Sequence, residues 1–310
     1  MPLSRNDILT LFDRIRVWQR SGHRAPHKPL LVLLALGRLA QGKSGPVEFA
    51  DIEPKMKELL TDFGPASSLN SRHYPFWHLA TDSGGSDRKL WRLEGPPGIL
   101  DRPAGATPTL GELKANHIKG GFPPEVTAAL QHDPALLGEV ATRILEAHFP
   151  STLHQDILET TGISLDSLIP AAPGKPVKRR DPAFREKVLM AYQYRCCVCG
   201  FDLRMGRQII GLEAAHIKWF QAGGPDIETN GLALCVLHHK IFDMGVFAIR
   251  PDDSVMLFSQ QLNGDKDTQG RLLAYHGSPL IQPQSPDYAP NTEFLHWHLK
   301  EVFRSPARPS

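Results

Sequence analysis

The chain has few cysteines, little net charge and no long apolar run. Its 310 residues include four cysteines, and 35 basic side chains nearly balance 33 acidic ones, which leaves a net charge of +2. A disulfide-stapled secreted scaffold is therefore excluded, and the total charge does not by itself indicate a nucleic-acid partner. The longest apolar run, residues 30–36, is much shorter than the roughly 20 residues of a membrane-spanning helix. Because no apolar stretch typical of a secretory signal follows the first charged residues, we expect a cytoplasmic protein.

The length and composition indicate two globular domains. Hydrophobic residues make up 41% of the chain and charged residues 22%, and 310 residues exceed a usual single domain of about 150. Proline and basic residues crowd residues 170–182 without a helical period, which indicates an interdomain linker. We predict an α+β protein with a mostly helical N-terminal domain and small sheet at 1–163, a linker at 164–182 and a second domain at 183–310.

Apolar residues at helical spacing predict most elements of both domains. In the first domain, helices are predicted at 6–20, 29–39, 52–60, 109–117, 125–131, 135–148 and 151–159, with short strands near 47–49 and 89–93. The second domain has predicted helices at 183–194 and 294–303. Trp297 lies between His296 and His298, and we expect this trio to pack within the last helix rather than to form a site.

Basic side chains gather in two places although the total charge is nearly neutral. Six fall between residues 1 and 28 and six between 175 and 187, against two acidic residues in each segment. Such clusters suit phosphate-facing surfaces and equally suit solvated helix faces. Charge alone leaves both interpretations open.

The four cysteines are clustered, and clustering in a chain without disulfides points to metal. Cys196 and Cys199 have the spacing of a metal-binding knuckle, and Cys235 with His238 repeats that spacing. These are four soft or borderline ligands, as tetrahedral structural zinc requires. The competing interpretation is a set of small buried apolar side chains. Cys197 is the extra thiol, either a spare or a substitute for Cys196.

A second pattern overlaps the first and suits metal-assisted hydrolysis. His239 and Asp243 are four residues apart, so on a helix they share one face and suit two ligands of a hard divalent cation. His216 falls where a strand is expected to end, and a neutral imidazole can take a proton from water. Asn230 lies between them in the sequence and can brace a loop by hydrogen bonding.

This ordered set resembles the HNH, or ββα-metal, nuclease motif. The three letters fall on His216, Asn230 and His239, within the strings Asn-Gly-Leu-Ala-Leu-Cys and His-His-Lys-Ile-Phe-Asp that the family favours. The resemblance implies that His216 is the general base, that Asn230 orients it, and that His239 and Asp243 hold a catalytic Mg²⁺ or Mn²⁺. It also implies structural zinc at the three cysteines and one histidine named above.

One position departs from the HNH pattern. Many members carry Asp or His directly before the general base and use it to hold the metal, but this chain has Ala215 there. Either the ion relies on His239, Asp243, water and phosphate oxygens, or Glu213 on the same strand face reaches in. Weak metal binding is the expected consequence, and an inactive nuclease fold kept for DNA binding is an alternative.

Three polar strings stand out in the first domain, at residues 22–29, 70–78 and 116–123. They resemble the sulfur-binding domain of type IV, McrA-like restriction endonucleases, which cut phosphorothioate-modified DNA. The resemblance spans residues 1–163, and with the HNH motif it covers nearly the whole chain. In that family an apolar pocket accepts the sulfur that replaces a phosphate oxygen. The matching pocket positions here are His23, Arg24, Tyr74 and Pro75.

The physical chemistry of sulfur agrees with such a pocket. Sulfur is larger, more polarizable and less strongly hydrated than oxygen, so a proline ring and a tyrosine face can replace its water at low cost. We expect the Gly120–Gly121 pair to let a loop approach the duplex, and Phe76 and Trp77 to lie in the core. The remaining candidates for contacts to phosphate or bases are Lys28, Asn70, Arg72, His78, Asn116, His117 and Lys119.

The resemblance thus implies a modification-dependent endonuclease acting on double-stranded DNA that carries phosphorothioate. Since one HNH centre cuts one strand, we expect a homodimer. A first alternative is an HNH enzyme that reads a methylated or otherwise modified base in an aromatic sandwich, for which Trp18, Tyr74, Trp77 and Trp91 are candidates. A second is a catalytically inactive, HNH-fold regulator that binds DNA.

Overall fold

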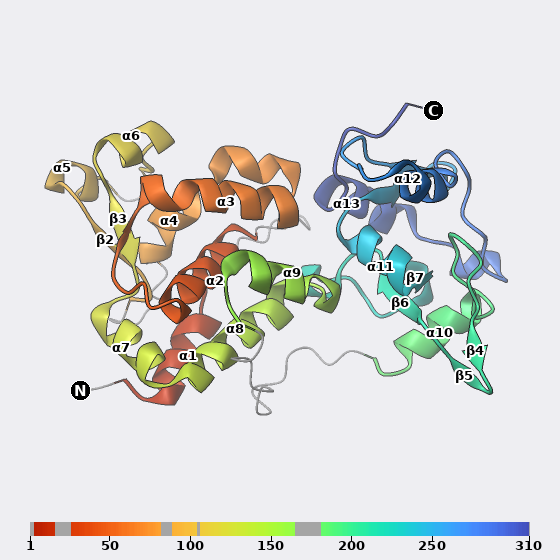
Figure 1. Ribbon diagram of the computed structural model, residues 1–310, viewed down its shortest axis with the longest axis horizontal. Coiled ribbons are helices and arrows are strands. Elements are labelled where there is room, and N and C mark those ends of the chain that lie inside the picture. The colour runs from red at the N-terminus through yellow and green to blue at the C-terminus, as the bar shows by residue number, and fades with distance from the viewer. Residues whose placement is uncertain (1–2, 16–25, 82–88, 104–105, 165–180, 310) are drawn as a thin grey trace. The chain divides into compact units, whose positions relative to one another are not determined.

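The computed structural model describes residues 3–15, 26–81, 89–103, 106–164 and 181–309. The chain divides into two compact units, an N-terminal unit described up to residue 164 and a C-terminal unit described from residue 181 (Figure 1). The predicted linker at 164–182 falls almost wholly outside the described residues, so its bounds stay a prediction. Within the described ranges, no helix is both long and apolar enough to span a membrane.

The N-terminal unit is helical with one small sheet, as predicted. Its central helix, α2 (His27–Ala40), carries the longest apolar run of the chain, and Leu30, Leu31 and Leu33 on it are fully buried. It packs against α3, α4, α8 and α9 (Figure 1). The other helices of the unit are α1 (Arg5–Asp13), α3 (Phe49–Phe63), α4 (Tyr74–His78), α5 (Pro97–Leu100), α6 (Leu110–Ala115), α7 (Pro124–His132), α8 (Pro134–His148) and α9 (Ser151–Thr161).

The small sheet contains a strand that the sequence did not predict. The strands β1 (Val47–Glu48) and β2 (Arg92–Glu94) flank β3 (Lys119–Gly121), and all pairs are antiparallel. A Cβ added to Gly120 would lie 2.7 Å from the Phe76 ring and from the Trp91 indole nitrogen. Gly120 therefore admits two aromatic rings to the core, whereas Gly121 lies against the Pro46 backbone. The expectation of a loop at this pair is wrong, because both glycines lie in β3, and its approach to the duplex stays a prediction. Because glycine disfavours strands, local propensity gave no signal for β3.

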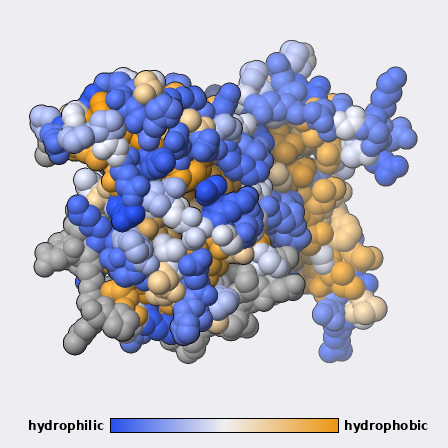
Figure 2. Space-filling model, turned by 60° about the vertical axis from the view of Figure 1, so that its left-hand side comes forward, coloured by the Kyte–Doolittle hydropathy of each residue, from blue (hydrophilic) through white to orange (hydrophobic). Residues whose placement is uncertain are grey.

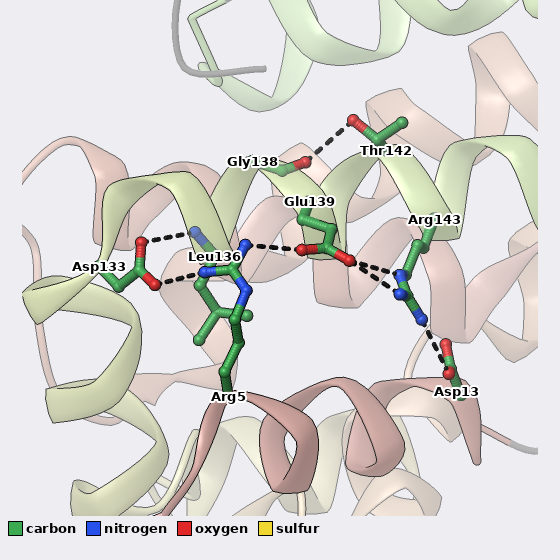
Figure 3. Close-up of polar contacts among 8 residues, drawn as sticks. All are labelled: Arg5, Asp13, Asp133, Leu136, Gly138, Glu139, Thr142 and Arg143. Carbon is green, nitrogen blue, oxygen red and sulfur yellow. Dashed lines mark hydrogen bonds and ion pairs between the residues drawn. The ribbon is translucent and has the colours of Figure 1, made fainter. Parts of the chain in front are cut away.

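A chain of ion pairs fastens α1 to α8 (Figure 3). Arg5 on α1 contacts Asp133 and donates to Glu139 Oε2 at 2.6 Å. Glu139 also accepts from Arg143 Nη2 at 2.8 Å, and Arg143 Nη1 reaches Asp13 at 3.2 Å. Since Glu139 is buried, two guanidinium groups around it offset the cost of removing its charge from water. These basic residues therefore serve the fold.

The C-terminal unit contains a ββα arrangement. Strand β6 (Leu212–His216) pairs antiparallel with β7 (Gly231–Cys235), so that His216 lies opposite Gly231, and α11 (Val236–Asp243) follows β7 directly. Helix α10 (Phe184–Ala191) packs on both strands. The other helices and strands are β4 (Arg204–Met205), β5 (Gln208–Ile209), β8 (Phe247–Ile249), β9 (Met256–Phe258), α12 (Lys266–Leu273) and α13 (Thr292–Glu301).

The predicted closing helix forms as α13, and its aromatic residues are in the core. Trp297 is buried with its ring 6.0 Å from that of Trp219. His298 is also buried and stacks on Phe242 with ring centroids 3.7 Å apart. The prediction that these residues pack within the helix is confirmed for Trp297 and His298.

Exposed large apolar side chains are unevenly divided between the two units. Figure 2 shows a largely hydrophilic face, with the most extensive apolar area in the right-hand part of the view and smaller apolar patches elsewhere. Among the described residues of the N-terminal unit, Tyr74 is the one large apolar or aromatic side chain that is exposed, at 48%. The C-terminal unit exposes Met190, Leu203, Met205, Ile227, Val236, Leu237 and Ile281.

Candidate functional site

His216 stands at the end of β6, between an aromatic ring and a carboxylate. Its ring stacks on Phe184, with centroids 4.1 Å apart and an interplanar angle of 18°. Its Nε2 lies 2.7 Å from Oδ1 of Asp226 in the loop after β6, and both side chains are close to nine-tenths buried. Asp226 was not among the predicted site residues. An acidic residue in a Gly-Gly-Pro-Asp loop shortly before Asn230 was the only signal for it.

Asn230 is fully buried and braces the loop between the two strands. Its Oδ1 accepts a hydrogen bond from the Lys218 backbone N–H at 2.9 Å. Its Nδ2 donates to the carbonyls of Lys218 and Pro225 at 3.0 and 2.9 Å. Both amide hydrogens are therefore used on loop backbone. Bracing was one of the roles that the sequence suggested. The residue that Asn230 holds, Pro225, directly precedes Asp226, the partner of His216.

His239 on α11 lies between two carboxylates. Its Nε2 is 3.3 Å from Oδ2 of Asp243 one turn later, and its Nδ1 is 2.7 Å from Oε2 of Glu213 on β6. Burial lowers the pKa of His239, but the two carboxylates outweigh burial and raise the pKa to about 9. The pocket thus favours positive charge on or next to this ring, whether a proton or a cation supplies it.

The His239 and Asp243 pair fits a small divalent cation. Two ligands that bind such an ion at about 2.1 Å and at a right angle lie about 3 Å apart, close to the observed Nε2–Oδ2 distance. Glu213 holds the opposite ring nitrogen, as a carboxylate commonly does for a metal-binding histidine. With Ala215 before His216, the sequence left open whether Glu213 is itself a ligand of the ion. In the structure Glu213 contacts Nδ1 of His239, whereas Asp243 lies at Nε2, so Glu213 does not share the Nε2 side with Asp243. Ala215 itself is buried.

The predicted zinc ligands form one cluster. The ligand atoms of Cys196, Cys199, Cys235 and His238 all lie within 4.8 Å of one another. The Nδ1 of His238 is 3.5 Å from the Cys196 sulfur and 3.2 Å from the Cys235 sulfur. Tetrahedral zinc with bonds of roughly 2.0–2.3 Å would set nitrogen and sulfur about 3.5 Å apart, so the cluster fits the ion.

Cys197 is separate from this cluster. It is fully buried, its backbone N–H donates to the Ala233 carbonyl, and burial raises the pKa of its thiol. Of the two roles left open for Cys197, the spare thiol in the core is the one observed, and Cys196 takes the ligand position.

In the N-terminal unit, α4 carries part of the expected sulfur pocket. Tyr74 is half exposed, and its ring packs edge-on against His73 and His78 with centroids 4.7 and 5.9 Å away. Pro75, the residue after Tyr74, is buried in the first turn of α4. His78 Nε2 is 2.7 Å from the Thr107 hydroxyl. His23 and Arg24 lie outside the described residues.

The other residues that were expected to contact DNA differ in their surroundings within the protein. Arg72 pairs with the buried Glu53 and donates to the Leu69 carbonyl at 2.8 Å, so it serves the fold as well as any contact to DNA. Asn116 closes α6 by donating to the Glu112 carbonyl at 2.8 Å. The side chains of His117 and Lys119 are 76% and 47% exposed beside Glu48. Asn70 is exposed, and Lys28 is half-buried in the first turn of α2.

The aromatic residues proposed for a base sandwich do not all reach the surface. Trp91 is fully buried between Phe76 and Phe122, with ring centroids 5.7 Å from each. Trp77 is half-buried, and Trp18 lies outside the described residues. The expectation that Phe76 belongs to the core is confirmed, since it is 1% exposed. Trp91 is therefore removed from the candidates for reading a flipped base.

Two family models match separate parts of the chain. The sequence model of the ScoMcrA-like DNA sulfur-binding domain matches residues 5–166, and that of HNH endonucleases matches residues 196–250. No curated protein matches the chain.

Several solved structures are similar to part of the chain. The sulfur-binding domain of ScoMcrA complexed with phosphorothioated DNA is 22% identical, with a TM-score of 0.44, over 52% of this chain and 98% of that one. The sulfur-binding domain of SprMcrA complexed with phosphorothioated DNA is 20% identical, with a TM-score of 0.40, over 53% and 97%. The type IV phosphorothioation-dependent restriction endonuclease ScoMcrA is 22% identical, with a TM-score of 0.37, over 47% and 32%.

Proposed function

The chain belongs to the family with a ScoMcrA-like DNA sulfur-binding domain, and on this premise we propose that it is an endonuclease that recognises phosphorothioate-modified DNA and cuts near the mark. The observation that carries the proposal is the joint match of residues 5–166 to that domain and of residues 196–250 to HNH endonucleases. One part reads the modification, and the other hydrolyses a phosphodiester bond.

Tyr74 supports sulfur reading by the N-terminal unit. It is an exposed aromatic side chain on a unit whose other described large apolar side chains are covered. A ring in this position can give up its water to sulfur at low cost, whereas a phosphate oxygen would lose strong hydration there. Pro75, the second apolar residue expected in the pocket, follows Tyr74 in the first turn of α4 and is buried. We assign His23, Arg24, Tyr74 and Pro75 to the pocket.

Further polar side chains of the N-terminal unit would hold the DNA backbone. Contacts to phosphate fix position on the duplex without reading sequence, and contacts to base edges in the grooves add sequence preference. We assign phosphate or base contacts to Lys28, Asn70, His117 and Lys119. His117 and Lys119 lie beside Glu48, and Arg72, His78 and Asn116 also have partners within the fold, so a contact to DNA would be additional to these.

In the C-terminal unit we assign general-base catalysis to His216. An ionised Asp226 can only accept a hydrogen bond, so Nε2 of His216 is the donor and Nδ1 has the lone pair that can take a proton from water. The water oxygen then attacks phosphorus, and the bond from phosphorus to the leaving sugar oxygen breaks. His239 and Asp243 would hold Mg²⁺ or Mn²⁺, which when bound would neutralise charge on the scissile phosphate. Asn230 holds the loop beside His216.

We assign structural zinc to the cluster of three cysteines and one histidine. Cys196 and Cys199 follow α10, while Cys235 and His238 belong to the start of α11. A bound zinc would therefore tie the segment after α10 to the helix that carries His239, without an open position for chemistry. Because a single HNH centre cuts one strand, we also propose that the protein acts on duplex DNA inside the cell as a homodimer.

The experiment that tests this function compares matched plasmids from cells with and without phosphorothioation. The protein is incubated with each in Mn²⁺ or in chelator, and His216→Ala serves as the catalytic control. We expect cutting of the sulfur-modified plasmid alone, only with Mn²⁺, and loss of cutting in the variant.

Other outcomes would each overturn a part of the proposal. Cutting that is indifferent to sulfur would remove the role of the N-terminal unit. Cutting that follows base methylation would favour the reader of a modified base. Sulfur-selective binding without any nicking would favour an inactive HNH fold.

A further inference from the structure

Asp226 is the acidic residue closest to the catalytic histidine, and no motif assigns it a role. Its Oδ1 is 2.7 Å from Nε2 of His216. The two side chains are 11% and 12% exposed, so little water screens the contact. A charge-assisted hydrogen bond at this distance and depth fixes the direction of an imidazole ring far better than an exposed one.

The loop that carries Asp226 is held from several sides. Asn230 donates to the Pro225 carbonyl, the residue directly before Asp226, and binds Lys218 through both its amide oxygen and its amide nitrogen. A Cβ at Gly224 would lie 1.8 Å from the Lys218 carbonyl oxygen, so the close approach of the loop requires glycine. The second carboxylate oxygen of Asp226 accepts from the Asp181 backbone N–H at 2.6 Å. The carboxylate is thus fixed before any substrate arrives.

The Phe184 ring fixes the plane of the His216 imidazole. Phe184 on α10 stacks on the His216 ring, so rotation of the imidazole about its χ2 angle would break the stacking. The stacked ring and the carboxylate together define both the plane of the imidazole and the nitrogen that keeps its proton. In catalytic and metal-binding histidines, such a partner on one nitrogen sets the reactivity of the other.

We propose that Asp226 is a positioning residue that fixes His216 in the Nε2–H tautomer, with Asn230 acting on His216 through the Asp226 loop. The inference rests on the proposed function, since it takes His216 as the general base. The inference gives the Asn of the HNH motif a physical task in this chain. Asn230 holds the loop that carries Asp226, and the Asp226 carboxylate orients the His216 imidazole.

The most direct test is the tautomer of His216 in the intact protein. Nitrogen-15 NMR of histidine-labelled protein distinguishes Nε2–H from Nδ1–H in a neutral ring, and His216→Gln assigns the signal. We expect Nε2–H in the wild type. An Nδ1–H ring in the wild type would overturn the proposal, and this result does not depend on nuclease activity.

Kinetics of variants at Asp226 give the second readout. Asp226→Asn can donate its amide N–H to Nε2, so we expect Nδ1–H in the NMR spectrum and a fall in kcat of at least about 100-fold, with KM changed by less than about threefold. Asp226→Glu retains the carboxylate, and we expect it to keep the tautomer and to recover part of kcat. Asp202→Asn, an exposed aspartate of the same unit, is the matched control and should match wild type.

The two proposals fail in different ways. Wild-type protein that cuts no phosphorothioated DNA but shows the Nε2–H ring would overturn the proposed function alone. An active wild type in which Asp226→Asn leaves the tautomer unchanged, or leaves kcat unchanged, would overturn the role of Asp226 alone.

Discussion

At the residue scale, the contacts of the His239 ring show how the chain could hold a cation although alanine directly precedes His216, the proposed general base. Glu213 binds Nδ1, which leaves Nε2 next to Asp243 on the same helix face. A carboxylate on the far nitrogen of a metal-binding histidine raises its basicity and fixes its orientation. Glu213 would thus support a cation through the His239 ring, whereas the missing residue would bind it directly.

Glu213→Gln should weaken the cation site without removing a ligand. The glutamine can still accept the hydrogen bond from Nδ1, but the negative charge is lost, so we expect the Mn²⁺ concentration for half-maximal cutting to rise about 10- to 100-fold. A titration of the cutting rate with Mn²⁺ measures this. Glu125→Gln, an exposed change on α7, is the control, and an unchanged Mn²⁺ requirement in Glu213→Gln would contradict the role.

The site residues that could be predicted are those fixed by local spacing. Cys196 with Cys199, Cys235 with His238, and His239 with Asp243 are each set by one turn of chain, and the structure brings each pair together. Asp226 could not be predicted, because its contact with His216 depends on a loop closed by Asn230. Arg72 shows the converse, since a sequence reveals a cation but not the carboxylate, Glu53, that the fold places beside it.

At the element scale, the three-stranded sheet depends on glycine in its central strand. Gly120 pairs with Val47 on one side and Leu93 on the other, and the Phe76 and Trp91 rings cover it. The longer helices of this unit were predictable because an apolar stripe repeats along many residues, whereas the short α4 and α5 were not predicted. Strand β3 is three residues long, two of them glycine, and only its tertiary neighbours make it a strand.

Two glycine substitutions separate packing from local propensity. Gly120→Ala should destabilise the protein by about 1–3 kcal/mol, because its Cβ would press on two aromatic rings. Gly111→Ala on α6 has no atom within 4 Å of the new Cβ, so it should be neutral or stabilise by up to about 1 kcal/mol. Urea denaturation measures both. Equal effects of the two substitutions would contradict the packing role of Gly120.

Helix α3 is joined to two other segments by the buried carboxylate of Glu53. Burial raises the pKa of Glu53, but Arg72 and Lys114 outweigh it and hold the pKa below its ordinary value. A carboxylate with a depressed folded pKa stabilises the fold above its unfolded pKa, and the contribution is lost as pH falls through the folded value. The stabilisation is therefore present at neutral pH and disappears in acid.

Glu53→Gln should make the stability of the protein depend less on pH in the acid range. We expect a lower melting temperature at pH 7, and a smaller further decrease between pH 5 and acid than in the wild type. Calorimetry across that pH range measures the difference, with Glu58→Gln, a more exposed change on the same helix, as control. Parallel pH curves for wild type and Glu53→Gln would rule out the contribution.

At the scale of the whole molecule, reading and cutting belong to two units with separate cores. The N-terminal unit is held by an apolar helix bundle, a small sheet and ion pairs, and the C-terminal unit by a ββα core beside a cluster of metal-ligand side chains. The order of the two units followed from the positions of the motifs, and their α+β character followed from the spacing of apolar residues together with the nuclease resemblance. The tertiary partners within each unit did not, because they join segments far apart in the sequence.

Loss of zinc should affect one unit and spare the other. Cys235→Ala removes a ligand, so we expect loss of bound zinc and a fall of at least about 10 °C in one calorimetric transition, with sulfur-selective DNA binding retained. Cys197→Ala is the matched control, because this thiol is buried next to the cluster but is not part of it. Equal zinc content in both variants would contradict the assignment of Cys235.

Recognition of sulfur by the chain is tested most directly by equilibrium binding to two duplexes that differ in a single atom. The cutting-deficient His239→Ala variant is titrated with a duplex carrying one phosphorothioate and with the same duplex carrying phosphate. A preference for sulfur of at least about tenfold in Kd, or about 1.4 kcal/mol, is expected. Equal dissociation constants for the two duplexes would contradict it.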